Sequence, residues 1–289
     1  NFMKGKNFSL SPYITDYEQG ISITTDKENL IPALEYMSYT IKEPKIDDVI
    51  FKTMIENTKE AILNRNNSPR AVYSDEISKI YSGNNQRRLP LSLEDLEKIN
   101  KNEALNTFKN KFDDFNGYQL LVVGSFDEKK LPALLEKYFA SLPSSEKVIF
   151  PKPLDLNIPK DIVKKEVVKG IDKKSTVTLI FPYNSTYGEK ERILYSGFSR
   201  VLNIALIEDI REKIGGVYSI SSKVSLSPNN FGEDRMTISF SCDTKRVNEL
   251  TKAVLQVISD MSNKDIDQKK IDSIIKNYEL SYKNELKEN

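Results

Sequence analysis

The residue types best suited to chemistry stand in one short stretch, 211–218, which reads Arg-Glu-Lys-Ile-Gly-Gly-Val-Tyr. Arg211 carries a planar fork of N–H donors that suits a carbonyl or carboxylate, and Tyr218 carries a phenolic O–H donor. We expect the two glycines to form a turn that directs both side chains toward one region, where they would bind a peptide backbone or an oxyanion. The simpler interpretation is a helix end with a glycine cap and a strand tyrosine, and the residue types alone favour it.

Other kinds of catalytic site are excluded by the composition. The sequence contains no histidine, which removes Ser–His and Cys–His nucleophiles and the usual zinc sites. Its single cysteine, Cys242, permits no internal disulfide. The absence of histidine therefore predicts no imidazole chemistry and no usual zinc site in this segment. The paired acids at 47–48, 113–114 and 233–234 are interpreted as turns and helix starts rather than cation sites.

Charge and hydropathy exclude two classes of partner. The 43 basic and 42 acidic residues give a net charge of +1, so no basic field exists to attract nucleic acid. No apolar run approaches the length of a membrane span. We expect neither a nucleic acid partner nor a membrane-spanning segment.

The elements that position Arg211 and Tyr218 are predicted in the second half of the chain. Apolar residues at helical spacing indicate a long helix over 189–211, directly before the glycines. Alternating residues indicate strands at 175–182, 217–226 and 234–242, and a short charged strand at 164–168. Two further helices are predicted at about 245–261 and 266–286.

The first half has a similar plan. Two short strands are predicted within 6–25, and several helices follow, one of them with Ser92 as its N-cap and Asp95 completing a capping box. The run Tyr-Gln-Leu-Leu-Val-Val-Gly at 118–124 predicts a buried strand. A proline-containing tract without periodicity follows.

These patterns predict an α+β fold with two similar domains, each an antiparallel sheet with helices packed on one face. The predicted ranges are 1–145 for the first domain, 146–160 for the linker and 161–289 for the second domain, which carries Arg211 and Tyr218.

The chain resembles the second half of the pitrilysin/insulin-degrading-enzyme family, the inverted zinc peptidases (inverzincins). Arg211, Glu212, Gly215 and Tyr218 match the segment R-E-x-x-G-x-x-Y of that half. Further stretches resemble it in the same order, namely 93–112, 118–127, 138–143 and 174–179. The resemblance covers nearly the whole chain and is nearest to bacterial single-chain members. The first domain looks shortened at its N-terminus.

The resemblance implies a division of labour between two halves. The first half of the family carries H-x-x-E-H and a later Glu, which bind zinc and activate water. Because that motif is absent here, we expect zinc in an N-terminal half or a partner subunit. The present chain would then be inactive alone, would close one side of the substrate chamber, and would contact peptide through Arg211 and Tyr218. Periplasm and cytoplasm both remain open as compartments.

A second interpretation keeps the fold without the catalytic role. Some relatives of the family are binding or structural subunits that lack the zinc motif altogether. The intact Arg211 and Tyr218 argue against this alternative.

Overall fold

A computed structural model describes residues 4–146, 152–154, 156–227 and 233–288. The chain divides into two compact units, residues 1–168 and 169–289. The linker expected at 146–160 stays a prediction, because residues 147–151 and 155 lie outside the described part.

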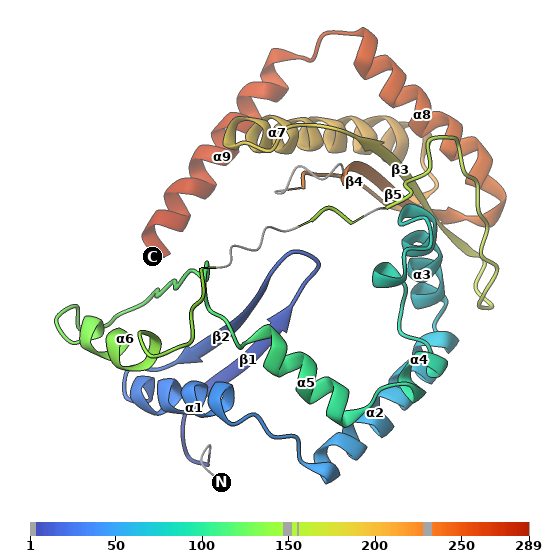
Figure 1. Cartoon of the computed structure of the whole chain (residues 1–289). Coiled ribbons are helices and arrows are strands. Elements are labelled where there is room, and N and C mark those ends of the chain that lie inside the picture. Colours follow the sequence, from blue (N-terminus) through green and yellow to red (C-terminus); the bar gives the residue numbers. More distant parts are fainter. Residues whose placement is uncertain (1–3, 147–151, 155, 228–232, 289) are drawn as a thin grey trace. The chain divides into compact units, whose positions relative to one another are not determined.

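The first unit is built around a two-stranded antiparallel sheet. Strands β1 (Phe8–Ile14) and β2 (Gln19–Thr25) pair as the sequence predicts. Helix α1 (Leu30–Lys42) packs on this sheet, with α6 (Leu131–Phe139) beside it (Figure 1). A small core forms where Leu34 and Met37 meet Tyr138. The sheet and its helices thus share one apolar layer.

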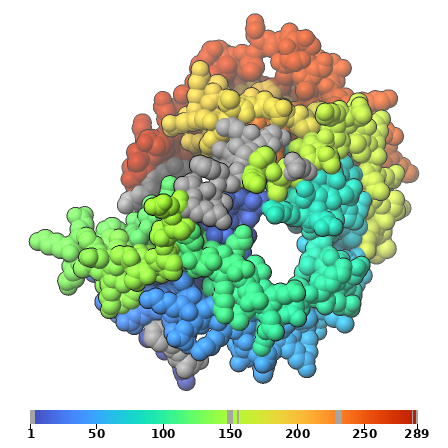
Figure 2. Space-filling model, viewed as in Figure 1, coloured from blue at the N-terminus to red at the C-terminus, as the bar shows by residue number. Residues whose placement is uncertain are grey.

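The remaining helices of this unit pack less tightly. They are α2 (Asp48–Asn67), α3 (Pro69–Tyr81), the 3₁₀ turn η1 (Gln86–Arg88), α4 (Leu93–Glu97) and α5 (Lys101–Lys111). The capping box of Ser92 and Asp95 is present at α4, as predicted. Helix α5 buries none of its residues, and Figure 2 shows an opening bordered by the cyan to green segments of this unit.

The prediction of a strand at 118–124 is wrong. This segment is neither helix nor strand, and the side chains of Leu121 and Val123 are 86% and 84% exposed. A run of apolar and β-branched residues indicates strand propensity, but a strand also needs neighbours with which to pair. The strand predicted at 164–168 is absent for the same reason, and Val168 is exposed.

The second unit contains a three-stranded antiparallel sheet in the order β3-β5-β4. Its strands are β3 (Lys174–Tyr183), β4 (Val217–Ser225) and β5 (Asp234–Asp243), close to the predicted ranges. The helical elements are α7 (Glu189–Leu206), the π-helix η2 (Ile207–Ile214), the 3₁₀ turn η3 (Thr244–Arg246), α8 (Val247–Asn263) and α9 (Gln268–Glu288).

The two faces of this sheet differ in character. Helices α7 and α8 cover one face and α9 packs against α7 (Figure 1). Leu206 and Ile210 meet Ile238 and Phe240 there in a continuous apolar core. The opposite face carries hydroxyl pairs such as Thr178–Ser239 at 3.2 Å. The predicted α+β class, with antiparallel sheets and helices on one face, is confirmed.

None of the helices in the described ranges is both long and apolar enough to cross a bilayer.

Candidate functional site

Arg211 lies on a widened helix. Helix α7 changes at Ile207 into a π-helix that ends at Ile214, whereas the sequence predicts regular helix as far as 211. Ile210 is fully buried and anchors this turn in the core, which leaves the neighbouring Arg211 exposed. Within the described residues its guanidinium has no hydrogen bond or ion pair. The π geometry forms the last part of the helical segment before the glycine turn, and it presents a guanidinium with which no described residue pairs.

The glycine turn between the π-helix and β4 requires both glycines. Gly215 and Gly216 have φ values of 70° and 87°, a region that disfavours other residues. A Cβ on Gly216 would also lie 1.7 Å from Nη1 of Arg246. The turn predicted from the two glycines is therefore present, and its conformation is closely determined.

A β-bulge presents Tyr218. Val217 pairs with Cys242 and Ser219 pairs with Ser241, so Tyr218 is the extra residue in β4. Regular alternation from Ile220 would turn Tyr218 toward the core. The bulge reverses this, because Val217 is buried and the Tyr218 side chain is 62% exposed. Bulges re-aim side chains in this way next to active sites.

Lys174 extends the site across the sheet. It begins β3, and its Nζ lies 5.3 Å from the centroid of the Tyr218 ring. This distance is within the range of a cation–π interaction, which helps to orient the phenol. Next to this pair, the hydroxyls of Ser219 and Ser241 lie 3.1 Å apart. Lys174 was not predicted as a site residue, because its neighbour across the sheet depends on the strand register.

Arg246 contacts the backbone of the glycine turn. Its Nη1 donates to the carbonyl oxygen of Gly215 at 3.0 Å, and its Nε donates to Glu249 at 3.0 Å. The Arg246 guanidinium lowers the pKa of the Glu249 carboxyl, so the pair is charged over a wide pH range. Arg246 was not predicted either, although the spacing Arg-x-x-Glu at the start of a helix indicates an ion pair.

The chemistry available here is hydrogen-bond donation to an anion or carbonyl. Arg211 and Tyr218 stand at the two ends of one short turn, both open to solvent. Among the described contacts, none joins these two side chains to each other. Their donors are free for a ligand, and a peptide backbone offers acceptors of the matching kind.

These residues do not fit a zinc ion. The chain has no histidine, and the described residues include no group of three or more His, Cys, Asp or Glu side chains suited to a metal. Burial raises the pKa of the Cys242 thiol, which opposes the thiolate that zinc requires.

The acidic pairs have structural roles. Asp47 caps α2, as its position before the helix predicts. Asp114 accepts from the N–H of Asn116 and of Ser145. Asp234 is buried and accepts from two loop amides, those of Ser185 at 2.7 Å and Ser227 at 2.6 Å. The oxygens of Asp47, Asp114 and Asp234 accept from backbone amides, at a helix start, in a loop and at the start of β5. The expected helix start is present at Asp47, whereas Asp234 begins a strand.

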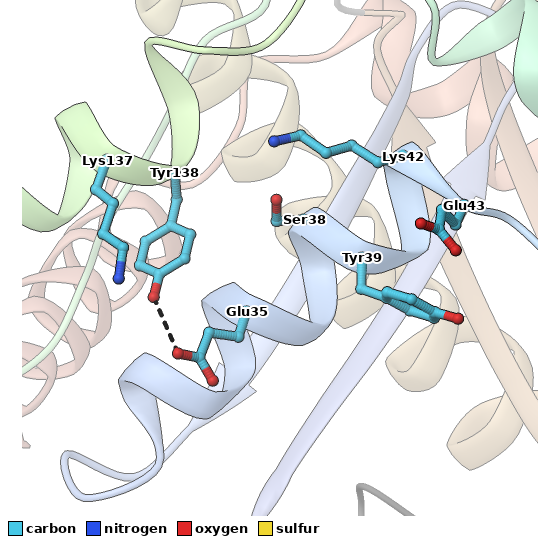
Figure 3. Close-up of a pocket in the computed structure, with 7 residues that line it drawn as sticks. All are labelled: Glu35, Ser38, Tyr39, Lys42, Glu43, Lys137 and Tyr138. Carbon is cyan, nitrogen blue, oxygen red and sulfur yellow. Dashed lines mark hydrogen bonds between the residues drawn. The ribbon is translucent and has the colours of Figure 1, made fainter.

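A depression of about 390 Å³ in the first unit is a weaker candidate (Figure 3). It is lined by residues of α1 and α6, and the Tyr138 hydroxyl donates to Glu35 at 3.4 Å. Lys137 lies over the same ring, with Nζ 4.8 Å from its centroid. Glu35 and Lys137 both contact the Tyr138 side chain, so these groups are engaged within the protein.

Comparison with known proteins identifies the family of the chain. Residues 99–278 match the family described as Peptidase M16 inactive domain. A zinc protease PQQL-like protein of Arabidopsis thaliana is 24% identical over 256 residues, which cover 82% of this chain and 26% of that protein.

Two solved structures share the fold. The periplasmic protease PqqL from Escherichia coli superposes with a TM-score of 0.83 at 19% identity, covering 97% of this chain and 31% of that one. The ferredoxin protease FusC, solved with Arabidopsis ferredoxin, gives 0.74 at 16% identity, with 98% and 31% covered. The chain thus spans under a third of the length of these relatives. The predicted resemblance is confirmed, and the chain belongs to the family of peptidase M16 inactive domains.

Proposed function

We propose that this chain is the zinc-free half of a pitrilysin-like zinc metallopeptidase, that it closes one side of the substrate chamber, and that it contacts the peptide through Arg211 and Tyr218. Cleavage then needs a zinc-bearing half, on the same polypeptide or in a partner subunit. The zinc protease relatives support this, since each is more than three times as long as the part that aligns.

The observation that carries the proposal is the presentation of two unengaged donors on one turn. The π-helix exposes Arg211 beside a fully buried residue, and the bulge exposes a tyrosine that strand alternation would bury. Both irregularities cost regular hydrogen bonding, and neither gives the Arg211 guanidinium or the Tyr218 hydroxyl a hydrogen-bond partner within the described residues. A contact with substrate accounts for both.

The two donors have different roles in this proposal. Tyr218 donates a hydrogen bond to the scissile carbonyl oxygen or its neighbour, which gains negative charge as the bond is attacked. Arg211 binds a backbone carbonyl or a carboxylate of the peptide and holds the chain in place. Tyr218 therefore acts mainly on kcat, and Arg211 mainly on KM.

We also propose that the substrate is a peptide or an extended segment of a protein, and that the enzyme is periplasmic. The complex of FusC with ferredoxin supports a protein substrate, and the periplasmic E. coli relative supports that compartment.

The test uses the chain assembled with its zinc-bearing half and a quenched fluorescent peptide. Tyr218→Phe should lower kcat about 10²-fold, because one oxyanion donor is typically worth 10²–10³ in rate. Arg211→Ala should raise KM by about tenfold or more, as expected for a lost charged hydrogen bond. Matched controls are Tyr282→Phe and Arg192→Ala, which change exposed residues of α9 and α7.

If both site variants keep the kinetics of the controls while the assembly forms normally, the proposal fails. That result would instead favour the binding or structural subunit of the same fold.

A further inference from the structure

Arg246 occupies the space that a side chain on Gly216 would fill. Its Nη1 is 1.7 Å, and its Cζ 2.7 Å, from the position of such a Cβ. The same Nη1 donates to the carbonyl oxygen of Gly215 at 3.0 Å. The guanidinium therefore lies directly against the backbone of the turn, and the lack of a side chain at Gly216 permits this approach.

The guanidinium is itself held in place. Nε donates to one carboxylate oxygen of Glu249 at 3.0 Å, and Nη2 donates to the other at 2.5 Å. This bidentate pair fixes the plane of the fork and leaves Nη1 directed at the turn. Glu249 lies in the first turn of α8, a helix anchored in the core by the fully buried Leu250. A rigid connection thus runs from the core through Glu249 and Arg246 to Gly215.

We propose that Arg246 is a positioning residue, which fixes the Gly215–Gly216 turn and thereby aims Tyr218 at the substrate. This inference rests on the proposed function for its catalytic consequence. The bulge at Tyr218 begins two residues after Gly215, so a displaced turn moves the bulge and the phenol with it. Arg246 does not itself touch the substrate.

Lysine cannot replace arginine in this role. Three nitrogens of the fork contact two groups that lie in different directions, the Gly215 carbonyl and the Glu249 carboxylate. An ammonium group on a flexible stem reaches one of them at a time. Arg246→Lys should therefore behave as Arg246→Ala does, although it keeps the charge.

A fluorescence experiment tests the positioning without any enzyme assay. The chain has no tryptophan, so Tyr218→Trp places a single reporter at the site. In that background, Arg246→Ala and Arg246→Lys should each shift the emission and increase quenching by acrylamide. Glu249→Gln should give a smaller change in the same direction.

The matched control is Arg65→Ala, which removes a bidentate pair with Asp75 in the first unit. It should leave the emission unchanged. Melting temperatures of all variants show whether each chain is folded. Unchanged emission and quenching in folded Arg246→Ala would overturn the proposal.

A double-mutant cycle in the assembled enzyme tests the catalytic consequence. Arg246→Ala should lower kcat about tenfold when Tyr218 is present, because small misplacements of a catalytic contact are costly. In the Tyr218→Phe background, Arg246→Ala should change kcat less than about twofold, since the hydroxyl that Arg246 positions is already absent. Equal losses in both backgrounds would show a general structural role and overturn the inference.

The two proposals can fail separately. If Tyr218→Phe has no kinetic effect while the reporter at position 218 responds to Arg246→Ala, the proposed function fails and the positioning of the turn stands. If Tyr218→Phe lowers kcat while Arg246→Ala leaves the emission and quenching of the reporter unchanged, only the positioning inference fails.

Discussion

Two residues without side chains decide where the donors of the site lie. Gly215 and Gly216 take backbone conformations that other residues rarely adopt, and Gly216 also leaves room for Arg246. The sequence predicts this turn from the glycine pair. It does not reveal that a third group, from a helix 30 positions later in the chain, fills the space beside it.

Gly216→Ala should lower the free energy of unfolding by about 2 kcal/mol or more, because it adds backbone strain and displaces Arg246. The control is Gly197→Ala within α7, where an added Cβ meets no atom within 4 Å. It should raise stability by about 0.5–1 kcal/mol through better helix propensity. Urea unfolding of both variants measures the difference. Equal effects of the two changes would contradict this account of the turn.

Cys242 should be unreactive in the folded chain. It is fully buried, and burial raises the pKa of its thiol, so the reactive thiolate is scarce at neutral pH. A thiol-specific reagent at pH 8 should label the folded chain far more slowly than the urea-unfolded chain, and the folded rate should rise with pH. Equal labelling rates would show that β5 is not covered as described.

The site residues could be predicted only in part, for a physical reason. Arg211 and Tyr218 lie within one short stretch, and the resemblance of that stretch to a family motif indicated them, whereas the residue types alone favoured a simple helix end. Lys174 and Arg246 reach the same site from other strands and helices. Their contacts depend on strand register and helix packing, which local patterns do not encode.

At the scale of elements, two irregularities present the residues of the candidate site. The long helix was predicted, but its change to π geometry at Ile207 was not, since no residue type marks it. The strand at 217 was predicted from alternation, and the bulge that exposes Tyr218 interrupts that alternation. Regular patterns thus predicted the framework and missed the two departures from it that present the donors.

At 118–124 the sequence pattern predicts a regular element that the structure lacks, because a strong strand pattern there forms no strand. Within the described residues, the amides of 119–125 donate no hydrogen bond. We expect them to exchange with deuterium within seconds at neutral pH, whereas the amides of β5, paired on both sides, should be protected by orders of magnitude. Mass spectrometry of peptides from both regions measures this. Comparable protection in the two regions would contradict the described exposure of Leu121 and Val123.

At the scale of the whole molecule, the two units differ in completeness. Within the described residues, the second has a three-stranded sheet and a continuous core of helix and sheet residues, whereas the first has two strands and a small core. The spacing of apolar residues predicted the α+β class, because helices and strands have different periods. The number of strands in each sheet depends on pairing and could not be predicted in the same way.

The proposed function also belongs to this scale, since it divides the reaction between this chain and a zinc-bearing half. The M16 family assignment and the length of the relatives support that division. The direct question is whether peptide touches the residues at the two ends of the glycine turn.

Photo-cross-linking answers that question. Benzoylphenylalanine would be placed at position 211, 218 or 282 of the assembled enzyme, which is treated with a chelator so that a labelled peptide is bound but not cut. The account predicts light-dependent cross-links from positions 211 and 218, lost when unlabelled peptide competes, and only background from 282. Cross-linking at 211 and 218 no stronger than at 282, with peptide binding intact, would contradict it.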